Sequence, residues 1–409
     1  MSSILSNYYY KDLKKYFKIL IPQNSKIFIT YEENLPRGKY DYIILVNALI
    51  NTGDAQQYVR KLRKHTHSKT RIIVIYFNFL WKPLLDLASK LGLRKTDLKE
   101  PNWFSSDDIR NILLLEGYEQ VKMGRRFLVP LNLPLISNFI NKFVSQLPLI
   151  NLFCLSTYQI FRLVPAIRDY SVSIVIPARN EEGNMKGVLK KIPKMGTRTE
   201  VIFVEGGSKD NTFNAIGEEI RMNTRKDLSA SLFKQKGKGK GDAVRLGFSK
   251  AKNEMLMILD ADLTVDPKDL PKFYSAISRG LCELANGSRL VYPMQKQAMR
   301  NLNYLGNKIF GTLFSYILGQ RVKDTLCGTK AILKEDYLSI EENRKYFGEF
   351  DPFGDFDLLF GAARLNLKIA DIPIRYGDRT YGSTNISRYT HGLLLIRMTL
   401  FAACKIKFI

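Results

Sequence analysis

Two aspartates one residue apart, Asp260 and Asp262, carry the clearest chemical meaning in this 409-residue chain. They directly follow the apolar run 255–259, and a continuous apolar run is typical of a buried strand. Two carboxylates at a strand end repel each other unless a cation neutralises them. Hard oxygen ligands there suit Mg²⁺ or Mn²⁺ that is also bound by substrate phosphates. The alternative is a turn or helix N-cap, where aspartate is common.

Two polar clusters follow other apolar runs of the sequence. In the first, Pro177 stops a strand, Asn180 shapes the turn, and Glu181 can accept hydrogen bonds from a base or ribose. In the second, Glu205 is another acceptor at a strand end, and the two glycines after it allow a tight turn. Both clusters suit a nucleotide pocket, although each taken singly is also typical of an ordinary turn.

A third cluster, residues 236–245, alternates lysine with glycine. Its glycines expose backbone N–H groups and its lysines supply positive charge, a combination that suits phosphates. The segment is neither a Walker loop nor a dinucleotide-binding loop, because Asp242 stands where the last glycine of the latter belongs. The cluster therefore indicates phosphate binding without naming a known loop.

The elements that must position these clusters form a β-α alternation that begins after a break near residues 165–170. We expect strands at 171–177, 200–204 and 254–259, and helices at 183–192, 211–221, 243–250 and 267–279. Such alternation favours a mostly parallel sheet with crossover helices. Ligands bind beyond the carboxyl ends of the strands in such sheets. Pro177, Glu205 and Asp260 all lie at such ends, so the sequence predicts one site.

In this order and spacing the clusters resemble glycosyltransferase family 2, the inverting nucleotide-sugar transferases with a GT-A fold. The resemblance covers roughly residues 171–390 and is closest to the branch of dolichyl- and polyprenyl-phosphate sugar synthases. It implies an α/β fold, a mostly parallel sheet with flanking helices. It also implies a nucleotide pocket lined by Pro177, Asn180, Glu181, Glu205, Ser208, Lys240 and Gly241.

The same resemblance makes Asp260 and Asp262 the DxD pair of the family. Asp260 would point toward the ribose or metal, and Asp262 toward the metal-diphosphate. Glu205 stands where many members have aspartate, which is a departure from the pattern.

Later segments extend the resemblance to the acceptor side. Residues 287–289 and 324–330 resemble the acceptor loops of the family, and residues 350–359 resemble the segment that carries its catalytic acid. Asp357 is the expected catalytic residue, with Asp355 in reserve, because the two face apart on a helix. A phosphate acceptor is already anionic, so this acid would then position the acceptor instead of deprotonating it. A helix N-terminal acid without a catalytic role is the alternative.

Arg379 begins a segment that resembles the loop that closes over the diphosphate in this family. Arginine can clamp a phosphate through two hydrogen bonds, and Gly382 permits close approach of the backbone. The QxxRW motif of processive synthases is absent from this region, which favours transfer of a single sugar.

The first part of the chain has a different character. Residues 1–130 resemble the C-terminal half of a class I methyltransferase, with strand-like segments at 39–47 and 70–76. The segment that should hold a glycine-rich cofactor loop, residues 25–33, contains no glycine. We therefore expect a smaller truncated Rossmann-like α/β domain that serves as a degenerate scaffold or docks the acceptor.

Charge and cysteine content limit the partners. The 63 Lys and Arg against 39 Asp and Glu give a formal charge of +24, which implies an anionic partner. The absence of nucleic-acid motifs favours phosphorylated ligands and an anionic membrane surface, with no nucleic acid. The four cysteines are far apart in the sequence, which indicates reduced thiols and neither disulfides nor a zinc site.

Two further segments look directed to a membrane. Residues 143–161 carry no charged side chain and suit short interfacial or buried helices, and the terminus suits a basic amphipathic helix. Packing of that last helix in a core is the alternative. The expected domains are a methyltransferase-like domain at 1–130, an apolar helical linker at 131–168, a GT-A domain at 169–390 and the amphipathic helix at 391–409.

The sequence thus predicts a metal-dependent, inverting glycosyltransferase that uses Mg²⁺ or Mn²⁺. It would move one sugar from a UDP- or GDP-sugar to a polyprenyl phosphate or a cell-envelope glycan. Its expected place is cytoplasmic, peripheral on the inner face of the cell membrane. The alternatives are a catalytically silent module that binds nucleotide sugars or membranes, and a bifunctional methyltransferase–glycosyltransferase.

Overall fold

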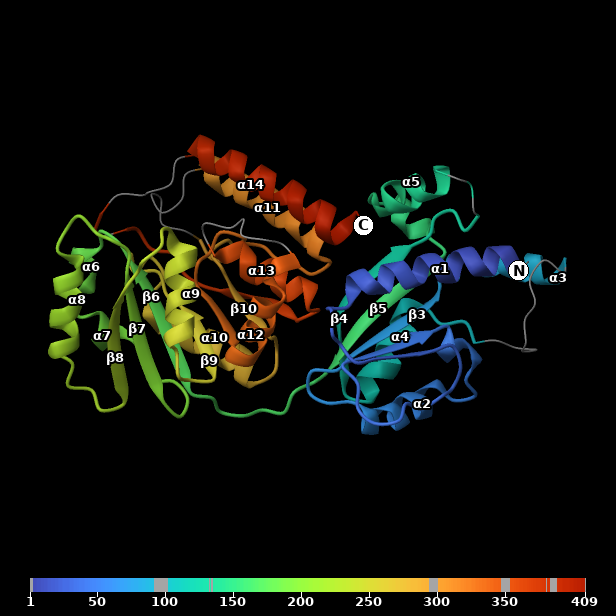
Figure 1. The fold of residues 1–409 in the computed structure, drawn as a ribbon, viewed down its shortest axis with the longest axis horizontal. Coiled ribbons are helices and arrows are strands. Elements are labelled where there is room, and N and C mark those ends of the chain that lie inside the picture. Colours follow the sequence, from blue (N-terminus) through green and yellow to red (C-terminus); the bar gives the residue numbers. More distant parts are fainter. Residues whose placement is uncertain are drawn as a thin grey trace. The chain divides into compact units, whose positions relative to one another are not determined.

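The computed structural model describes residues 3–91, 102–131, 133, 135–293, 301–346, 354–379, 381–382 and 388–408. The chain divides into two compact units (Figure 1). The first unit comprises Met1–Pro165 together with Ala403–Ile409, and the second comprises Ala166–Ala402. The chain therefore leaves the first unit once and ends in it.

A five-stranded sheet forms the centre of the first unit. Its order is β1 (Ile27–Thr30), β2 (Tyr42–Val46), β3 (Arg71–Phe77), β5 (Ser156–Leu163) and β4 (Tyr118–Arg126). The first three strands are parallel, whereas β5 is antiparallel to both of its neighbours. The helices are α1 (Ser3–Leu20), α2 (Ala55–Leu62), α3 (Lys82–Lys90), α4 (Ser106–Leu115) and α5 (Ile136–Lys142). Short turns are η1 (Ala48–Asn51), η2 (Arg63–His65), η3 (Phe79–Trp81), η4 (Val144–Gln146), η5 (Ile150–Phe153) and the π-helical turn η8 (Ala403–Lys407).

Helices cover both faces of this sheet. Tyr58 of α2 and Ile109 of α4 pack in one apolar cluster with Ile43 and Val74, while Tyr9 of α1 packs in another with Ile44. Alternate strand residues thus point to opposite layers. Helix α4 begins at the capping box that Ser105 forms with Asp108.

A seven-stranded sheet forms the centre of the second unit. Its order is β12 (Ile369–Pro373), β10 (Leu284–Ser288), β11 (Lys330–Leu333), β9 (Met255–Ile258), β6 (Val172–Ala178), β7 (Thr199–Glu205) and β8 (Leu228–Lys234). Only β11 runs antiparallel to its neighbours among these strands. The predicted α/β fold, a mostly parallel sheet with flanking helices, is confirmed for this unit.

The helices of the second unit flank both faces of this sheet. They are α6 (Glu182–Met185), α7 (Val188–Lys191), α8 (Thr212–Arg221), α9 (Lys240–Lys250), α10 (Leu270–Ser278), α11 (Asn301–Leu318), α12 (Lys334–Glu342), α13 (Asp355–Arg364) and α14 (Arg388–Ala402), with turns η6 (Pro267–Asp269) and η7 (Arg344–Tyr346). Helix α9 lies close to β6 because Gly247 faces Val175 without a side chain. Ile174 and Ile176 point to the other face, where they share a core with Phe273 of α10.

Two predicted segment assignments differ from the structure. Residues 156–163, expected within the helical linker at 131–168, form strand β5. Residues 156–161 carry no charged side chain, which suits a strand between β3 and β4 that is buried on both faces, and Ile160 and Phe161 are fully buried there. The expected helix at 391–409 is not one element either, because α14 ends at Ala402 and the π-helical turn η8 in the first unit follows.

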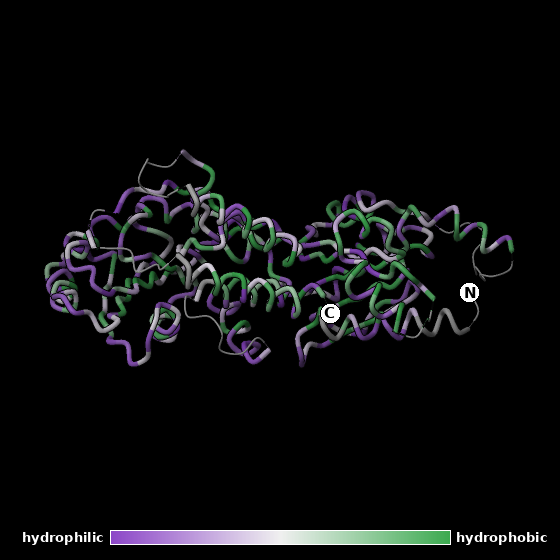
Figure 2. The backbone as a smooth tube through the Cα atoms, turned by 90° about the horizontal axis from the view of Figure 1, so that it is seen from above, coloured by the Kyte–Doolittle hydropathy of each residue, from purple (hydrophilic) through white to green (hydrophobic). Residues whose placement is uncertain are grey.

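Apolar residues of the strands are buried inside both units. Hydrophobic and hydrophilic stretches alternate along the backbone, and many outer segments are hydrophilic (Figure 2). No disulfide joins the four cysteines, all of which lie in the described part of the chain. Within the described residues, no helix has the length and hydropathy needed to span a membrane.

Candidate functional site

The carboxyl ends of three adjacent parallel strands meet at one edge of the second sheet. Strand β6 pairs with β7 on one side and with β9 on the other. Ala178 is in register with Glu205, and the Gly206 N–H donates to the Ala178 carbonyl at 2.9 Å. Pro177, Glu205 and Asp260 therefore lie at neighbouring strand ends.

Hydrogen bonds tie the loop after β6 to the loop after β7. The backbone N–H of Asn180 donates to Ser208 Oγ at 3.0 Å, and the N–H of Lys209 donates to Asn180 Oδ1 at 2.8 Å. Asn180 adopts φ +56°, a left-handed conformation that asparagine tolerates better than most residues. The buried carboxylate of Glu205 accepts from the N–H of Ser208. Three predicted pocket residues, Asn180, Glu205 and Ser208, thus form one connected rim.

Arg379 joins two of the predicted acidic residues. Its Nη1 donates to Glu181 Oε1 at 3.1 Å, and its Nη2 donates to Asp262 Oδ2 at 2.7 Å. Burial raises the pKa of Glu181 above its ordinary value, although hydrogen bonds from Asn184 and the charge of Arg379 oppose the shift. Asp262 is fixed further because its Oδ1 accepts from the N–H and hydroxyl of Thr264.

The loop that contains Arg379 lies against the β6 loop. A side chain at Gly382, whose φ is +76°, would meet the Asn180 carbonyl oxygen at 3.5 Å. Tyr381 lies directly against Gly183, where an added Cβ would fall 2.4 Å from its ring. Residues 380 and 383–387 of this loop are outside the described residues.

Lys240 and Asp260 form the second ion pair of the site. Lys240 Nζ lies 2.6 Å from Asp260 Oδ1. Burial alone would raise the pKa of Asp260, but the positive charges of Lys240, Lys330 and Arg289 outweigh it and lower that pKa. The geometry thus places a carboxylate among three basic side chains, an arrangement that keeps it ionised.

Two glycines bring later segments to this ion pair. A Cβ added at Gly328 would lie 2.0 Å from Lys240 Nζ and 2.4 Å from Asp260 Oδ2. Gly354, which precedes α13 with φ +75°, would place a Cβ 2.8 Å from the Cα of Gly241. The loop at 324–330 and the beginning of α13 therefore both reach the start of α9.

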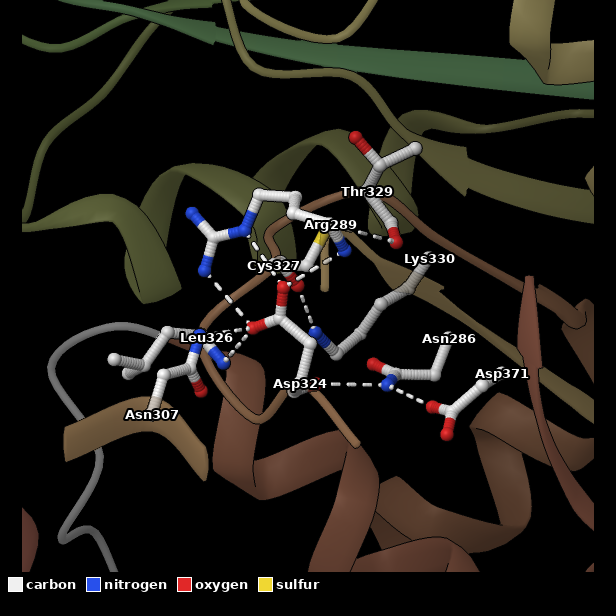
Figure 3. A network of polar contacts seen from close by, with 9 residues as sticks. All are labelled: Asn286, Arg289, Asn307, Asp324, Leu326, Cys327, Thr329, Lys330 and Asp371. Carbon is white, nitrogen blue, oxygen red and sulfur yellow. Dashed lines mark hydrogen bonds and ion pairs between the residues drawn. The ribbon is translucent and has the colours of Figure 1, made fainter. Parts of the chain in front are cut away.

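A buried polar network holds the loop at 324–330 (Figure 3). Arg289 donates through Nε and Nη2 to the two carboxylate oxygens of Asp324, at 2.7 and 2.9 Å. Burial alone would raise the pKa of Asp324, but the Arg289 charge lowers it to about 2. Asn286 bridges the Asp324 carbonyl to Asp371, and the ammonium of Lys330 donates to the Cys327 carbonyl. These contacts fix the backbone that carries Gly328.

The predicted catalytic acids are placed differently. Asp357 lies near the beginning of α13, where its buried Oδ2 accepts from Arg344 Nε at 2.9 Å. The Arg344 guanidinium also reaches Tyr337, so this carboxylate belongs to the contact between α12, η7 and α13. The side chain of Asp355 lies outside the described residues. The roles of both residues stay predictions.

Comparisons with known proteins place part of the second unit in a known family. Residues 173–339 match the model of glycosyl transferase family 2. A dolichyl-phosphate hexose transferase of Haloferax volcanii is 30% identical over 224 residues, which are 54% of this chain and 89% of the relative. The chain belongs to glycosyltransferase family 2. The glycosyltransferase AglJ of the same organism is 28% identical over 224 residues, 54% of this chain and 68% of the relative.

Solved structures show a more distant likeness. Glucosyl-3-phosphoglycerate synthase from Mycobacterium tuberculosis, in a crystal structure with Mn²⁺, UDP and glucosyl-3-phosphoglycerate, is 20% identical to this chain. The TM-score is 0.42, and the match covers 58% of this chain and 80% of that chain. Membership of the family makes this protein a glycosyltransferase.

The donor set of this glycosyltransferase fits a divalent cation that shares its coordination with a substrate. Asp260 and Asp262 carry hard carboxylate oxygens at one strand end, and such oxygens are the ligands that Mg²⁺ and Mn²⁺ prefer. Within the described residues, no group of three or more His, Cys, Asp or Glu side chains forms a complete metal site. The remaining ligands would therefore come from diphosphate oxygens and water.

Sequence reasoning missed several residues that shape this site. Arg344, which is paired with Asp357, belongs to no recognisable motif. Gly354 lies in the segment 350–359 that resembles the family, but its place against Gly241 was not predicted. Lys330 was noticed only as part of an acceptor loop, although its charge helps to lower the pKa of Asp260. A glycine directly before an expected helix was the available signal for Gly354.

Proposed function

We propose that this glycosyltransferase moves a single sugar, with inversion, from a UDP- or GDP-sugar to a polyprenyl phosphate. The observation that carries the proposal is Arg379, which joins Glu181 and Asp262 beside the strand ends that also hold the Lys240–Asp260 pair. Three carboxylates and two basic groups at one sheet edge suit a nucleotide diphosphate with its cation. Relatives named as dolichyl-phosphate transferases support the lipid phosphate acceptor over a cell-envelope glycan.

Each residue has a proposed task in this reaction. Asn180, Glu181, Glu205 and Ser208 would bind the nucleoside, because their loops form one rim at the ends of β6 and β7. Lys240 and Arg379 would bind diphosphate oxygens as cations. The backbone of Pro177 and Gly241 would shape the pocket. When bound at Asp260 and Asp262, Mg²⁺ or Mn²⁺ would offset charge on the departing diphosphate.

The acceptor phosphate would attack the sugar carbon from the face opposite the departing diphosphate. The new carbon–oxygen bond forms as the carbon–oxygen bond to the diphosphate breaks, so the configuration inverts. An anionic phosphate needs no general base. Asp357, which Arg344 holds in place, would therefore position the acceptor side of the site and accept no proton.

A lipid acceptor requires contact with a membrane, and one face of the second unit suits it. Helices α11 and α14 lie side by side (Figure 1). Leu305, Ile309 and Leu313 of α11 are exposed, as are residues of α14 at helical spacing, Leu393, Ile396 and Leu400. We propose peripheral binding to the inner face of the cell membrane through these helices, with the formal charge of +24 favouring anionic lipid.

Methyl transfer is not proposed for the first unit. Its β1 ends at Thr30, and the segment around it, residues 25–33, contains no glycine for a cofactor loop. The methyltransferase resemblance stays a prediction about the origin of the scaffold. Titration of the intact chain with S-adenosylmethionine should produce no heat, and binding there would restore the bifunctional alternative.

Calorimetry with UDP and GDP, each with and without Mn²⁺, tests the donor side of the proposal. Metal-dependent binding of one nucleotide is expected. Transfer of labelled sugar from the matching nucleotide sugar to a short-chain polyprenyl phosphate then tests the acceptor, and NMR of the product tests inversion. Binding of neither nucleotide, with or without Mn²⁺, would favour a catalytically silent module that docks on a membrane.

Gly328→Ala should impair catalysis without unfolding the protein. The new Cβ would fall within 2.4 Å of both Lys240 Nζ and Asp260 Oδ2. The Lys240 ammonium can move away at low cost to stability, but the Lys240–Asp260 ion pair is then separated. Loss of a charged contact of this kind lowers the transfer rate about tenfold or more. Steady-state kinetics and thermal melting check this. Gly217→Ala is the control, since that site has open space, and equal rates in both variants would contradict the assignment.

A further inference from the structure

The segment from α5 to η5 in the first unit has its polar residues inside and its apolar residues outside. Asn141, Ser145 and Gln146 are buried. The Asn141 amide bonds both to the N–H and to the carbonyl of Val129, at 2.9 and 2.8 Å. Ser145 donates to the Asn141 carbonyl, and Gln146 donates to Ser145 Oγ. Buried hydrogen bonds, not an apolar core, thus define the shape of this segment.

The outer surface of the same segment is apolar. Its exposed side chains include Leu135, Ile136, Phe139, Leu149 and Phe153. Leu80 of η3 extends this surface, because η3 is tied to η5 through the Trp81 Nε1 bond to the Phe153 carbonyl at 2.7 Å. We call these six residues the apolar rim. Several large apolar side chains exposed on one segment indicate a binding surface.

The two most exposed residues of the apolar rim have unusual backbones. Leu135 is 83% exposed with φ +65°, and Leu149 is 76% exposed with φ +68°. A positive φ is a genuine outlier for a bulky residue such as leucine, and such strain tends to persist at functional sites. Each leucine immediately precedes a helical turn, so the backbone is bent where the side chain projects.

The charge around the apolar rim favours lipid over protein as the occupant. No acidic residue occurs between Val121 and Pro165, or from Arg379 to the last residue. The two acid-free stretches meet in this unit, since Phe143 stacks on Phe408 with ring centroids 6.0 Å apart. Lys142 and Lys405 are exposed beside them. Apolar side chains bordered by lysines, without acids, match an anionic bilayer surface.

We propose that the apolar rim docks the first unit on an anionic lipid membrane, with Leu135 and Leu149 entering the acyl region and Lys142 and Lys405 meeting the headgroups. The inference deepens the proposed function, on which it rests for the lipid nature of the acceptor. It assigns the first unit a task of its own, that of holding the enzyme at the surface where such an acceptor is found.

Sedimentation of the full chain with vesicles tests the proposal. Vesicles of phosphatidylcholine with phosphatidylglycerol should bind the protein, and pure phosphatidylcholine vesicles should bind it more weakly. The double variant Leu135→Ser/Leu149→Ser should lose at least about tenfold in vesicle affinity. Leu115→Ser is the matched control: Leu115 is also highly exposed, at 70%, but it precedes the beginning of β4, whereas Leu135 and Leu149 follow its end. The control should bind like the parent protein.

Two other readouts separate this inference from the proposed function. Nucleotide binding by the double variant should equal that of the parent protein, because no residue of the second unit changes. Vesicle binding that depends on the two leucines supports the docking surface even where no sugar transfer is found. Equal vesicle binding by the double variant and the parent would overturn it. The proposal would also be overturned if the parent protein did not bind vesicles but formed dimers that the double variant could not form.

Discussion

Replacing Asp262 by asparagine should lower the rate of sugar transfer at least about 100-fold while the fold stays intact. Asparagine preserves the shape of the side chain and the acceptor for Thr264, but it removes the charge that faces Arg379 at 2.7 Å. A carboxylate that holds a catalytic cation contributes several kcal/mol to the barrier, which corresponds to a factor of about 100 or more. Transfer kinetics measure the loss of rate, and calorimetry with nucleotide and Mn²⁺ measures the accompanying loss of nucleotide and metal binding.

Asp266→Asn is the matched control for this experiment. Asp266 is an exposed carboxylate four residues further along that caps η6 through the N–H of Lys268. Asparagine caps as well as aspartate does, so neither stability nor transfer rate should change. If the Asp262→Asn enzyme kept the parent rate of sugar transfer and the same dependence on Mn²⁺, the assignment of Asp260 and Asp262 to the cation and the diphosphate would be wrong.

The strand ends of the second unit could be predicted because they are local features. The apolar run before Asp260 and the glycines after Glu205 are visible in a few consecutive residues, and β9 and β7 each end within one residue of the expected position. Parallel strands bring their carboxyl ends to one edge, so convergence follows from the β-α alternation. Gly187 was not recognised as a break, and its φ of +74° divides the expected helix at 183–192 into α6 and α7.

Long-range pairing could not be predicted in the same way. The sequence of β5 suggests an apolar linker. Its apolar residues are explained by the position of β5 between β3 and β4, which depends on pairing with strands far away in the sequence. The first unit consequently extends to Pro165 instead of residue 130. Arg344 is a surface-like arginine in the sequence, and its bond to Asp357 depends on the packing of α12 beside α13. Nothing local in the sequence determines such a pair.

Asp324→Asn should destabilise the second unit by about 3–5 kcal/mol. The carboxylate is fully buried and accepts from Arg289, Asn307 and two backbone N–H groups, those of Arg289 and Leu326. Asparagine leaves the Arg289 guanidinium without a counter-charge in a buried place, the costliest way to break an ion pair. Denaturant unfolding measures the loss in the free energy of unfolding, provided that the transition of the second unit is followed.

The pH dependence of the same variant identifies the cause. Because folding lowers the pKa of Asp324 from 3.8 to about 2, its charge stabilises the folded protein above pH 3.8 by about 2 kcal/mol. That contribution disappears as the pH falls through about 2. The difference in the free energy of unfolding between the parent protein and the variant should therefore become smaller in acid. Asp227→Asn, which breaks the exposed pair of Asp227 with Arg225, should change little at any pH because solvent screens that pair. A similar loss in the free energy of unfolding in both variants would mean that burial does not make the Arg289–Asp324 pair more stabilising than the exposed pair. The loop against Asp260 would then owe its position to other contacts.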